Sequence, residues 1–151
     1  MIKVYVDTSV FGGCFDAEFE EWSNRLIEEF KAGFKVLVIS DLTLKELEGA
    51  PPDVRNLVEE IPEEDREYVV LNDEARVLAR HYIEEGVVSE GYLVDAQHIA
   101  IATVSRVDVL VSWNFKHIVN LSKIRLYNSV NLKYGYPLLE IRSPREVLYE
   151  G

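Results

Sequence analysis

The sequence has a single cysteine, Cys14, and no apolar run of the roughly 20 residues that a membrane-spanning helix needs. One cysteine cannot form a disulfide within the chain, which argues against the small, disulfide-stapled folds of secreted proteins. The segment Met1–Asp7 also lacks the apolar core and the small-residue cleavage site of a signal peptide. We therefore expect a cytoplasmic protein that does not associate with membranes.

The motifs of several enzyme classes are missing as well. The chain has no Ser-His-Asp order, no reactive-cysteine signature and no glycine-rich loop that would cradle phosphates. A haloacid-dehalogenase-type phosphatase would need Asp-x-Asp after the first strand, whereas Asp7 is followed by Thr8 and Ser9. A receiver domain would need an acidic pair at the end of that strand, and none is present. Both alternatives are disfavoured.

Positive charge is scarce. The net charge of −11 argues against a general nucleic-acid binder, because binding to phosphates normally requires Lys and Arg. The charges are also unevenly distributed, since residues 1–95 are strongly acidic and residues 96–145 contain two acids, Asp108 and Glu140. The bases of this second segment are Arg106, Lys116, Lys123, Arg125, Lys133, Arg142 and Arg145. We expect an electrostatically polarised molecule; chance segregation of solvated side chains is the alternative.

The length and composition are those of a folded protein with one core. The 151 residues match the commonest domain size, and 48% of them are hydrophobic. We therefore expect one domain over residues 1–151. Short runs rich in β-branched and aliphatic residues predict strands, and their continuous hydrophobicity favours a parallel sheet covered on both faces. These runs are residues 3–6, 35–39, 68–71, 107–112 and a weaker 138–141.

Helical patterns lie between the predicted strands. One apolar stripe predicts a helix that ends before Gly33, and its members are Phe15, Phe19, Trp22, Leu26 and Phe30. Two further patterns predict helices over residues 75–83, ending at Gly86, and over residues 96–103, with Asp95 at the start. The alternation of strands and helices predicts a doubly wound, three-layer α/β/α domain with a central, mostly parallel sheet of about five strands.

Polar side chains follow several of the predicted strands. Asp7 ends the first strand, and Asp41 follows the second as the expected N-cap of a helix that carries Glu46 one turn further on. Ser112 and Asn114 follow the fourth strand. Because ligands of open α/β sheets bind beyond the carboxyl ends of the strands, these side chains are predicted to share one edge of the sheet.

Carboxylates gathered at such an edge repel one another unless a cation compensates, and Mg²⁺ or Mn²⁺ prefers oxygen ligands. Asp95 could join the site, or it could simply interact with the positive end of its own helix dipole. Glu48 lies roughly 200° around the helix from Glu46, so only one of the two can face the site. His98, one turn after Asp95, could approach the site, although a packed or surface histidine is the favoured interpretation.

Four segments then resemble a known family. They are Val-Asp-Thr-Ser-Val (6–10), Leu-Lys-Glu-Leu (44–47), Val-Asp-Ala-Gln-His-Ile-Ala (94–100) and Leu-Val-Ser-Trp-Asn-Phe-Lys-His (110–117). Their order and separations resemble PIN domains, a family that includes VapC-type toxins of toxin–antitoxin pairs. The resemblance implies a parallel sheet between helices and a cluster of three or four acids that binds Mg²⁺ or Mn²⁺ for RNA hydrolysis.

The resemblance also implies roles for individual residues. Asp7, Glu46 and Asp95 match the first three acids of the family site. Asn114 stands near the position of a fourth acid; its carbonyl could ligate weakly or accept a metal-bound water, but it adds no charge. The site could therefore hold one metal rather than two, or hold it more weakly.

Further residues are candidates for supporting roles. Ser9 and Ser112 are predicted to hold carboxylates or water, although an ordinary turn hydrogen bond is an equal alternative for Ser9. Lys116 and His117 would lie at the mouth of the site, where a cation could meet an RNA phosphate. The basic segment 96–145 would line the entry path of the RNA.

The sequence therefore leads to two hypotheses. The first is a metal-dependent endoribonuclease, the toxin of a toxin–antitoxin pair, which the family implies to be a homodimer blocked by an antitoxin protein. The second is a catalytically silent PIN-fold binding module that acts through RNA or protein interaction. Asn114 and the net charge of −11 both motivate the second hypothesis.

Overall fold

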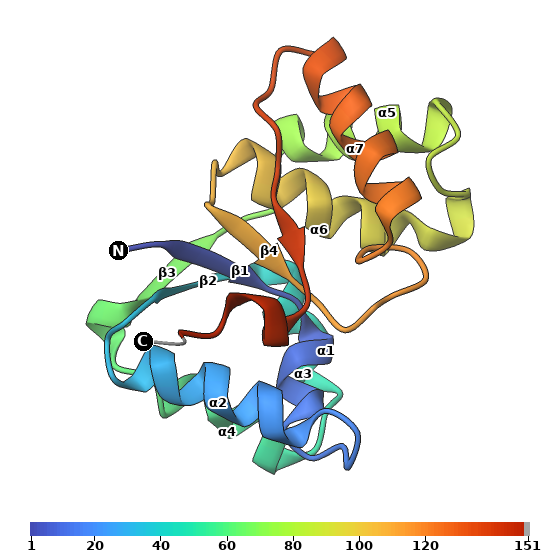
Figure 1. Ribbon diagram of the computed structural model, residues 1–151. Coiled ribbons are helices and arrows are strands. Elements are labelled where there is room, and N and C mark those ends of the chain that lie inside the picture. Colours follow the sequence, from blue (N-terminus) through green and yellow to red (C-terminus); the bar gives the residue numbers. More distant parts are fainter. Residues whose placement is uncertain (150–151) are drawn as a thin grey trace.

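The computed structural model describes residues 1–149 and places five strands in one sheet (Figure 1). The order is β3-β2-β1-β4-β5, and every neighbouring pair is parallel. The strands are β1 (Lys3–Val6), β2 (Val36–Ser40), β3 (Arg66–Val69), β4 (Val109–Val111) and β5 (Ile141–Arg142). The predicted central parallel sheet is confirmed.

Helices cover both faces of this sheet, so the three-layer architecture is confirmed (Figure 1). One layer contains α1 (Thr8–Gly13), α2 (Glu20–Lys31) and α4 (Pro52–Glu59), with α3 (Asp41–Glu48) beside it. The other contains α5 (Asp73–Glu84), α6 (Leu93–Val104) and α7 (Leu121–Lys133). Single 3₁₀ turns are η1 (Glu63–Asp65), η2 (Glu90–Tyr92) and η3 (Pro144–Val147). Within residues 1–149, none of the helices has the length and apolarity needed to cross a membrane.

The alternation of side chains along each strand supplies the two cores. Successive residues of a strand point to opposite faces of the sheet. Val4 and Val6 therefore pack into the core beneath α1, α2 and α4, whereas Tyr5 packs into the core beneath α5, α6 and α7. The central strands β2 and β4 divide their side chains in the same way. As a result, Tyr5 points toward α6 from within the strand that leads to Asp7.

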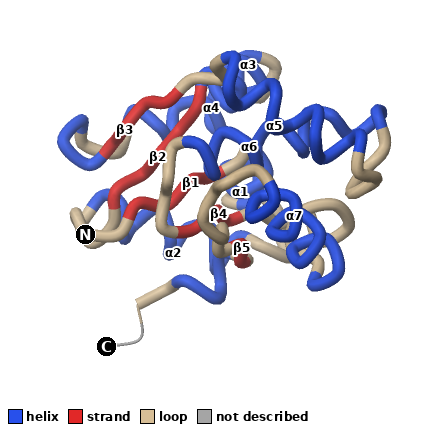
Figure 2. The backbone as a smooth tube through the Cα atoms, turned by 90° about the horizontal axis from the view of Figure 1, so that it is seen from above, coloured by secondary structure: helices blue, strands red, loops and turns tan. Residues whose placement is uncertain are grey.

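The strand order places a topological switch point between β1 and β4. The chain builds outward from β1 to β2 and β3, and then α5 and α6 carry it back to β4 on the other side of β1 (Figure 2). Crossovers on the two sides of this point cover opposite faces, and ligands of open α/β sheets bind outside the carboxyl ends of the strands at such a point. Asp7 and Ser112 are the residues that follow these two strands.

Several predicted boundaries are wrong at the edges of the sheet. β3 begins at Arg66 rather than Tyr68, and β5 covers Ile141 and Arg142 instead of 138–141. Pairing with the neighbouring strand sets these ends: Leu37 to Ser40 of β2 align with residues 66–69, and Leu110 with Val111 of β4 aligns with β5. Hydrophobic pattern alone does not encode that register.

The first predicted helix is also partly wrong. α2 begins at Glu20, and Phe15 lies outside it with an exposed side chain. The Asp16 carboxylate accepts a hydrogen bond from the backbone N–H of Glu18 (2.8 Å), a local turn that ends the preceding segment. The short helix α1, which starts directly after Asp7, was not predicted. Gly33 and Gly86 both have φ of +79° at the ends of helices, as their positions predict.

Candidate active site

Asp7 is the centre of the candidate site. It follows β1, occupies the N-cap position of α1 and is buried. Ser9 Oγ donates to Asp7 Oδ1 (2.6 Å), and Ser112 Oγ donates to Asp7 Oδ2 (2.6 Å). Because α1 begins directly after the strand, its first turn brings Ser9 back to the carboxylate. The ends of β1 and β4, far apart in sequence, therefore meet at Asp7 through side chains.

The environment of Asp7 disfavours a negative charge. Burial raises the pKa of its carboxyl, and the nearby charge of Glu46 adds to this effect. The charge of His98 and the hydroxyls of Ser112 and Ser9 lower the pKa, but they do not offset the burial. The ionised form of this carboxylate is thus costly, and a bound cation would offset that cost.

Glu46 lies beside Asp7 on α3. Its Oε1 accepts a hydrogen bond from Thr8 Oγ1 (3.0 Å) and one from His98 Nε2 (2.8 Å). Partial burial opposes ionisation, but the hydrogen bond and charge of His98, together with Thr8, lower the pKa of Glu46. Glu48 is exposed and makes no comparable contact among residues 1–149. Of Glu46 and Glu48, Glu46 is therefore the one that faces the site.

The start of α3 differs from the prediction. Ser40, and not Asp41, is the N-cap, because Ser40 Oγ accepts the backbone N–H of Thr43 (3.1 Å). Asp41 is the first residue of the helix, and its Oδ1 accepts the backbone N–H groups of Leu42 (2.8 Å) and Leu71 (2.9 Å). Asp41 thus holds the loop after β3 against α3.

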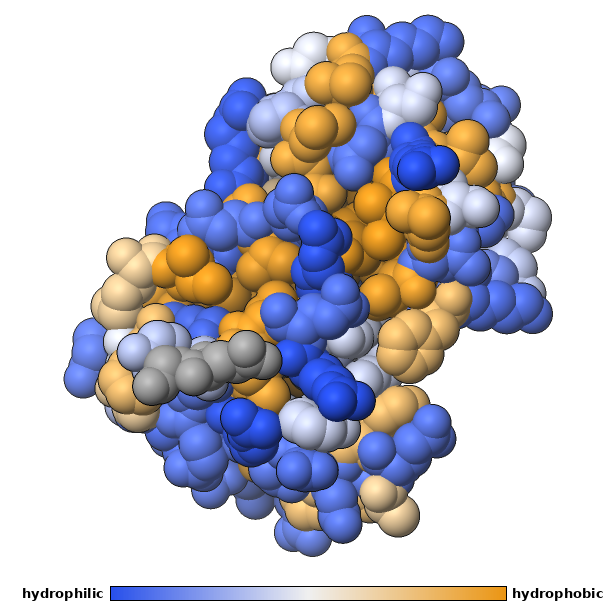
Figure 3. Space-filling view, in the orientation of Figure 1, coloured by the Kyte–Doolittle hydropathy of each residue, from blue (hydrophilic) through white to orange (hydrophobic). Residues whose placement is uncertain are grey.

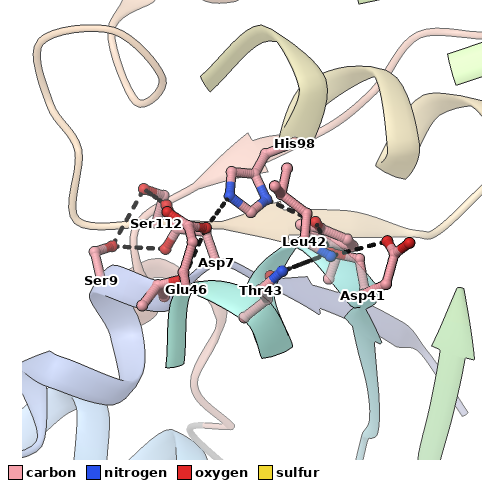
Figure 4. A network of polar contacts seen from close by, with 11 residues as sticks. Asp7, Ser9, Asp41, Leu42, Thr43, Glu46, His98 and Ser112 are labelled. Atoms are coloured by element: carbon pink, nitrogen blue, oxygen red, sulfur yellow. Dashed lines mark hydrogen bonds and ion pairs between the residues drawn. The ribbon is translucent and has the colours of Figure 1, made fainter. Parts of the chain in front are cut away.

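His98 is the residue that the sequence interpretation undervalued. It is buried on α6, and its Nε2 contacts Glu46 (Figure 4). Its Nδ1 lies 2.7 Å from the hydroxyl of Tyr5, so the ring bridges Glu46 to Tyr5. An ionised carboxylate only accepts hydrogen bonds, so Nε2 carries the proton toward Glu46. Tyr5 in turn contacts Ser40 Oγ (2.8 Å), which links this chain to the N-cap of α3. The positions of Tyr5, two residues before Asp7, and His98, three after Asp95, were the available sequence signal.

Asp95 lies in the first turn of α6, within the electrostatic field of the site. Burial raises the pKa of its carboxyl, and the charge of Asp7 raises it further. The charges of His117 and His98 and the side-chain amide of Asn114 act in the opposite direction. The charge of Asp7 thus disfavours the ionisation of Asp95.

Asn114 organises the loop after β4. Its Oδ1 accepts the backbone N–H groups of Lys116 (3.2 Å) and His117 (2.9 Å), and its own backbone N–H donates to Ser112 Oγ (2.9 Å). The carbonyl that could ligate a metal weakly is therefore used to close a turn. This loop lies on the side where the surface is indented between the two helical layers, at the right of Figure 3.

Lys116 and His117 differ in their access to a ligand. Lys116 is exposed next to Asn114. The ring of His117 lies against Tyr92 with a centroid distance of 3.7 Å, and its Nδ1 is buried without a hydrogen-bond partner among the described residues. Lys116 is thus the better placed of the two predicted RNA contacts.

Comparison with known proteins identifies the fold. No family model matches the chain, and no curated protein matches it. Twelve chains of solved structures do match it, among them the following two. Mycobacterium tuberculosis VapC20, a sarcin-ricin loop cleaving toxin, is 15% identical with a TM-score of 0.55, covering 76% of this chain and 92% of that chain. VapBC2 from Rickettsia felis, solved with a bound DNA fragment from its promoter, is 16% identical with a TM-score of 0.57. The match covers 94% of this chain and 98% of that chain. The chain has the VapC-type PIN fold.

The site of this PIN fold has suitable donors for a divalent cation, but they are not assembled as a cage. Within residues 1–149, no three His, Cys, Asp or Glu side chains form a group that could hold a metal ion as they are placed. Asp7 and Glu46 are instead held by hydroxyl and imidazole groups. The chemistry of these side chains fits a hard cation, because carboxylate oxygens are its preferred ligands. Burial also disfavours the ionised forms of Asp7 and Asp95, which a bound cation would stabilise.

Proposed function

We propose that the chain is a metal-dependent endoribonuclease, the toxin of a toxin–antitoxin pair. The main support for this proposal is that Ser112 donates a hydrogen bond to Asp7 at the switch point. Thr8, the residue after Asp7, donates a hydrogen bond to Glu46. Ligands of open α/β sheets bind at this place. VapC20, which has a similar fold, is a toxin that cleaves the sarcin-ricin loop, and this supports RNA as the substrate class.

In this proposal Asp7, Glu46 and Asp95 hold Mg²⁺ or Mn²⁺, with Asn114 at the border of the site. A divalent cation supplies charge stabilisation to a phosphodiester and lowers the pKa of water. The chain's own residues prepare the site for it. Ser9 and Ser112 fix both oxygens of Asp7, while His98 keeps Glu46 ionised and oriented. No covalent nucleophile is required.

A cleavage assay with matched variants tests the proposal. Single-stranded RNA is incubated with Mn²⁺ or Mg²⁺ and the wild-type chain, Asp7→Asn, Glu46→Gln or Glu48→Gln. We expect the first two variants to lose activity by roughly 100-fold or more, the scale of removing a catalytic electrostatic group. Glu48→Gln removes the same charge from an exposed position of the same helix and should retain activity. Equal cleavage by wild type and Asp7→Asn would refute the mechanism.

A silent PIN-fold binding module is the second candidate. It is favoured by the turn-closing role of Asn114 and by the lack of a ready-made metal group within residues 1–149. Calorimetric titration with Mn²⁺ separates the two candidates. Undetectable binding by a correctly folded wild-type chain would favour the module, whereas binding that Asp7→Asn abolishes would favour the nuclease.

The proposed partners follow from the nuclease assignment. An antitoxin blocks the toxins of the family that the sequence resembles, and the similarity to VapBC2 supports such a protein as the partner. The negative region around Asp7 and Asp95 would accept an arginine from such a protein. We further propose a cytoplasmic homodimer, and light scattering of the purified chain measures its mass in solution.

A further inference from the structure

A hollow lies next to the candidate site, bordered by α3, α5 and α6. Its volume is about 440 Å³, which is sufficient for a nucleotide-sized group. The lining residues are Asp41, Leu42, Lys45, Leu71, Arg76, Val94 and Gln97. We call this feature the Lys45–Arg76 hollow.

The Lys45–Arg76 hollow is positively charged in an otherwise acidic protein. Lys45 and Arg76 are exposed, and neither forms an ion pair with an acid of residues 1–149. The single carboxylate of the lining, Asp41, already accepts two backbone N–H groups through Oδ1. Two cations and the amide of Gln97 are therefore available to an anionic ligand.

The hollow and the candidate site share two helices. Lys45 precedes Glu46 on α3, and Gln97 precedes His98 on α6. The contact between His98 and Glu46 (2.8 Å) joins these helices, and in Figure 4 His98 lies between Asp7 on one side and Asp41 on the other. A strand held at the carboxylates can therefore continue past this contact and reach the hollow.

We infer that the Lys45–Arg76 hollow binds a backbone phosphate of the RNA strand whose cleavage is proposed above, and the inference rests on that function. A protein of net charge −11 repels a polyanion over most of its surface, so RNA binding requires local positive sites. Arg76 offers a planar guanidinium for two phosphate oxygens and Lys45 offers a compact charge. The hollow thus positions the strand and does not take part in the chemistry.

Binding without cleavage tests the inference directly. The anisotropy of a short fluorescently labelled single-stranded RNA is measured in EDTA with wild type, Lys45→Gln, Arg76→Gln and the double variant. Arg55→Gln is the matched control, because Arg55 is exposed on α4, in the layer on the other face of the sheet. We expect each hollow variant to weaken binding roughly three- to tenfold and the loss of one phosphate contact to reduce the salt slope by about 0.7.

The outcomes separate this inference from the proposed function. If wild type cleaves RNA and the hollow variants bind and cleave like Arg55→Gln, the inference is wrong and the nuclease stands. If wild type neither binds nor cleaves RNA, both are wrong. Inorganic phosphate is a further probe in this experiment. If phosphate shifts the NMR signals of Lys45 and Arg76 and RNA does not, the hollow binds free phosphate and not RNA. Circular dichroism melting of each variant confirms that the fold is retained.

Discussion

Gly13 and Gly12 are neighbours in α1 with opposite surroundings, and alanine at each should therefore change stability in opposite directions. A Cβ atom at Gly13 would lie 2.6 Å from Ser23 Oγ and 2.7 Å from Trp113 Nε1, distances that real Cβ atoms do not tolerate. A Cβ atom at Gly12 would meet no heavy atom within 4 Å. The pair isolates packing from helix propensity, because both residues belong to the same turn.

The expected magnitudes follow from these contacts. Replacing glycine by alanine inside a helix stabilises by about 0.5–1 kcal/mol, which is the full effect expected at Gly12. At Gly13 the added carbon must displace Ser23, which accepts from Trp113 Nε1 (2.8 Å) and donates to Val10 O (2.8 Å). Overpacking costs about 1–3 kcal/mol, and a broken buried hydrogen bond costs about 1 more. The Gly13→Ala variant should be destabilised by about 1–3.5 kcal/mol after the propensity gain is included.

Urea unfolding and calorimetric melting of the two variants measure the difference. For a chain of this size, about 1 kcal/mol corresponds to a Tm change of about 2–4 °C, so Gly12→Ala should melt above wild type and Gly13→Ala clearly below it. Because Trp113 also donates its backbone N–H to Ser9 Oγ (3.0 Å), Gly13→Ala should additionally reduce RNA cleavage. Equal melting temperatures for the two variants would refute the packing that positions Trp113.

Three further predictions address charge, pH and the network of the site. Without metal, the Asp7→Asn variant should have a higher Tm than wild type, because it lacks a costly buried charge. In a thermal-shift assay, Mn²⁺ at about 100 times its Kd should stabilise wild type by about 2.7 kcal/mol and leave the variant unchanged. Burial raises the pKa of Tyr5, Tyr82 and Tyr127. Below a pH of about 10 the three phenols keep their protons in the folded and the unfolded chain, so they do not change the free energy of unfolding. Above that pH the unfolded chain ionises first, and the free energy of unfolding falls by about 1.4 kcal/mol per pH unit for each tyrosine. Melting curves from pH 9 to pH 11 that stay flat would contradict this. His98→Ala should cost about 1–3 kcal/mol in urea unfolding, because two polar partners lose their contact; unchanged stability would remove His98 from the network.

Local features of this fold are readable in the sequence because they depend on neighbouring residues. The run Lys3–Val6, apolar after its first residue, is the strand β1, with the boundaries that the pattern predicts. Gly33 and Gly86 end helices with a positive φ that other residues rarely adopt. The edge strands β3 and β5 were misplaced, because their ends depend on pairing with β2 and β4 and not on their own composition.

The sequence alone determined the alternation of strands and helices, and with it a parallel three-layer fold that carries Asp7 at the carboxyl edge of its sheet. Only the tertiary structure decided that the switch point lies between β1 and β4, where Ser112 meets Asp7. It also showed that His98 orients Glu46 across 52 residues of sequence. The physical reason is that periodicity records which face of an element is buried, whereas strand order and side-chain contacts depend on packing between distant elements.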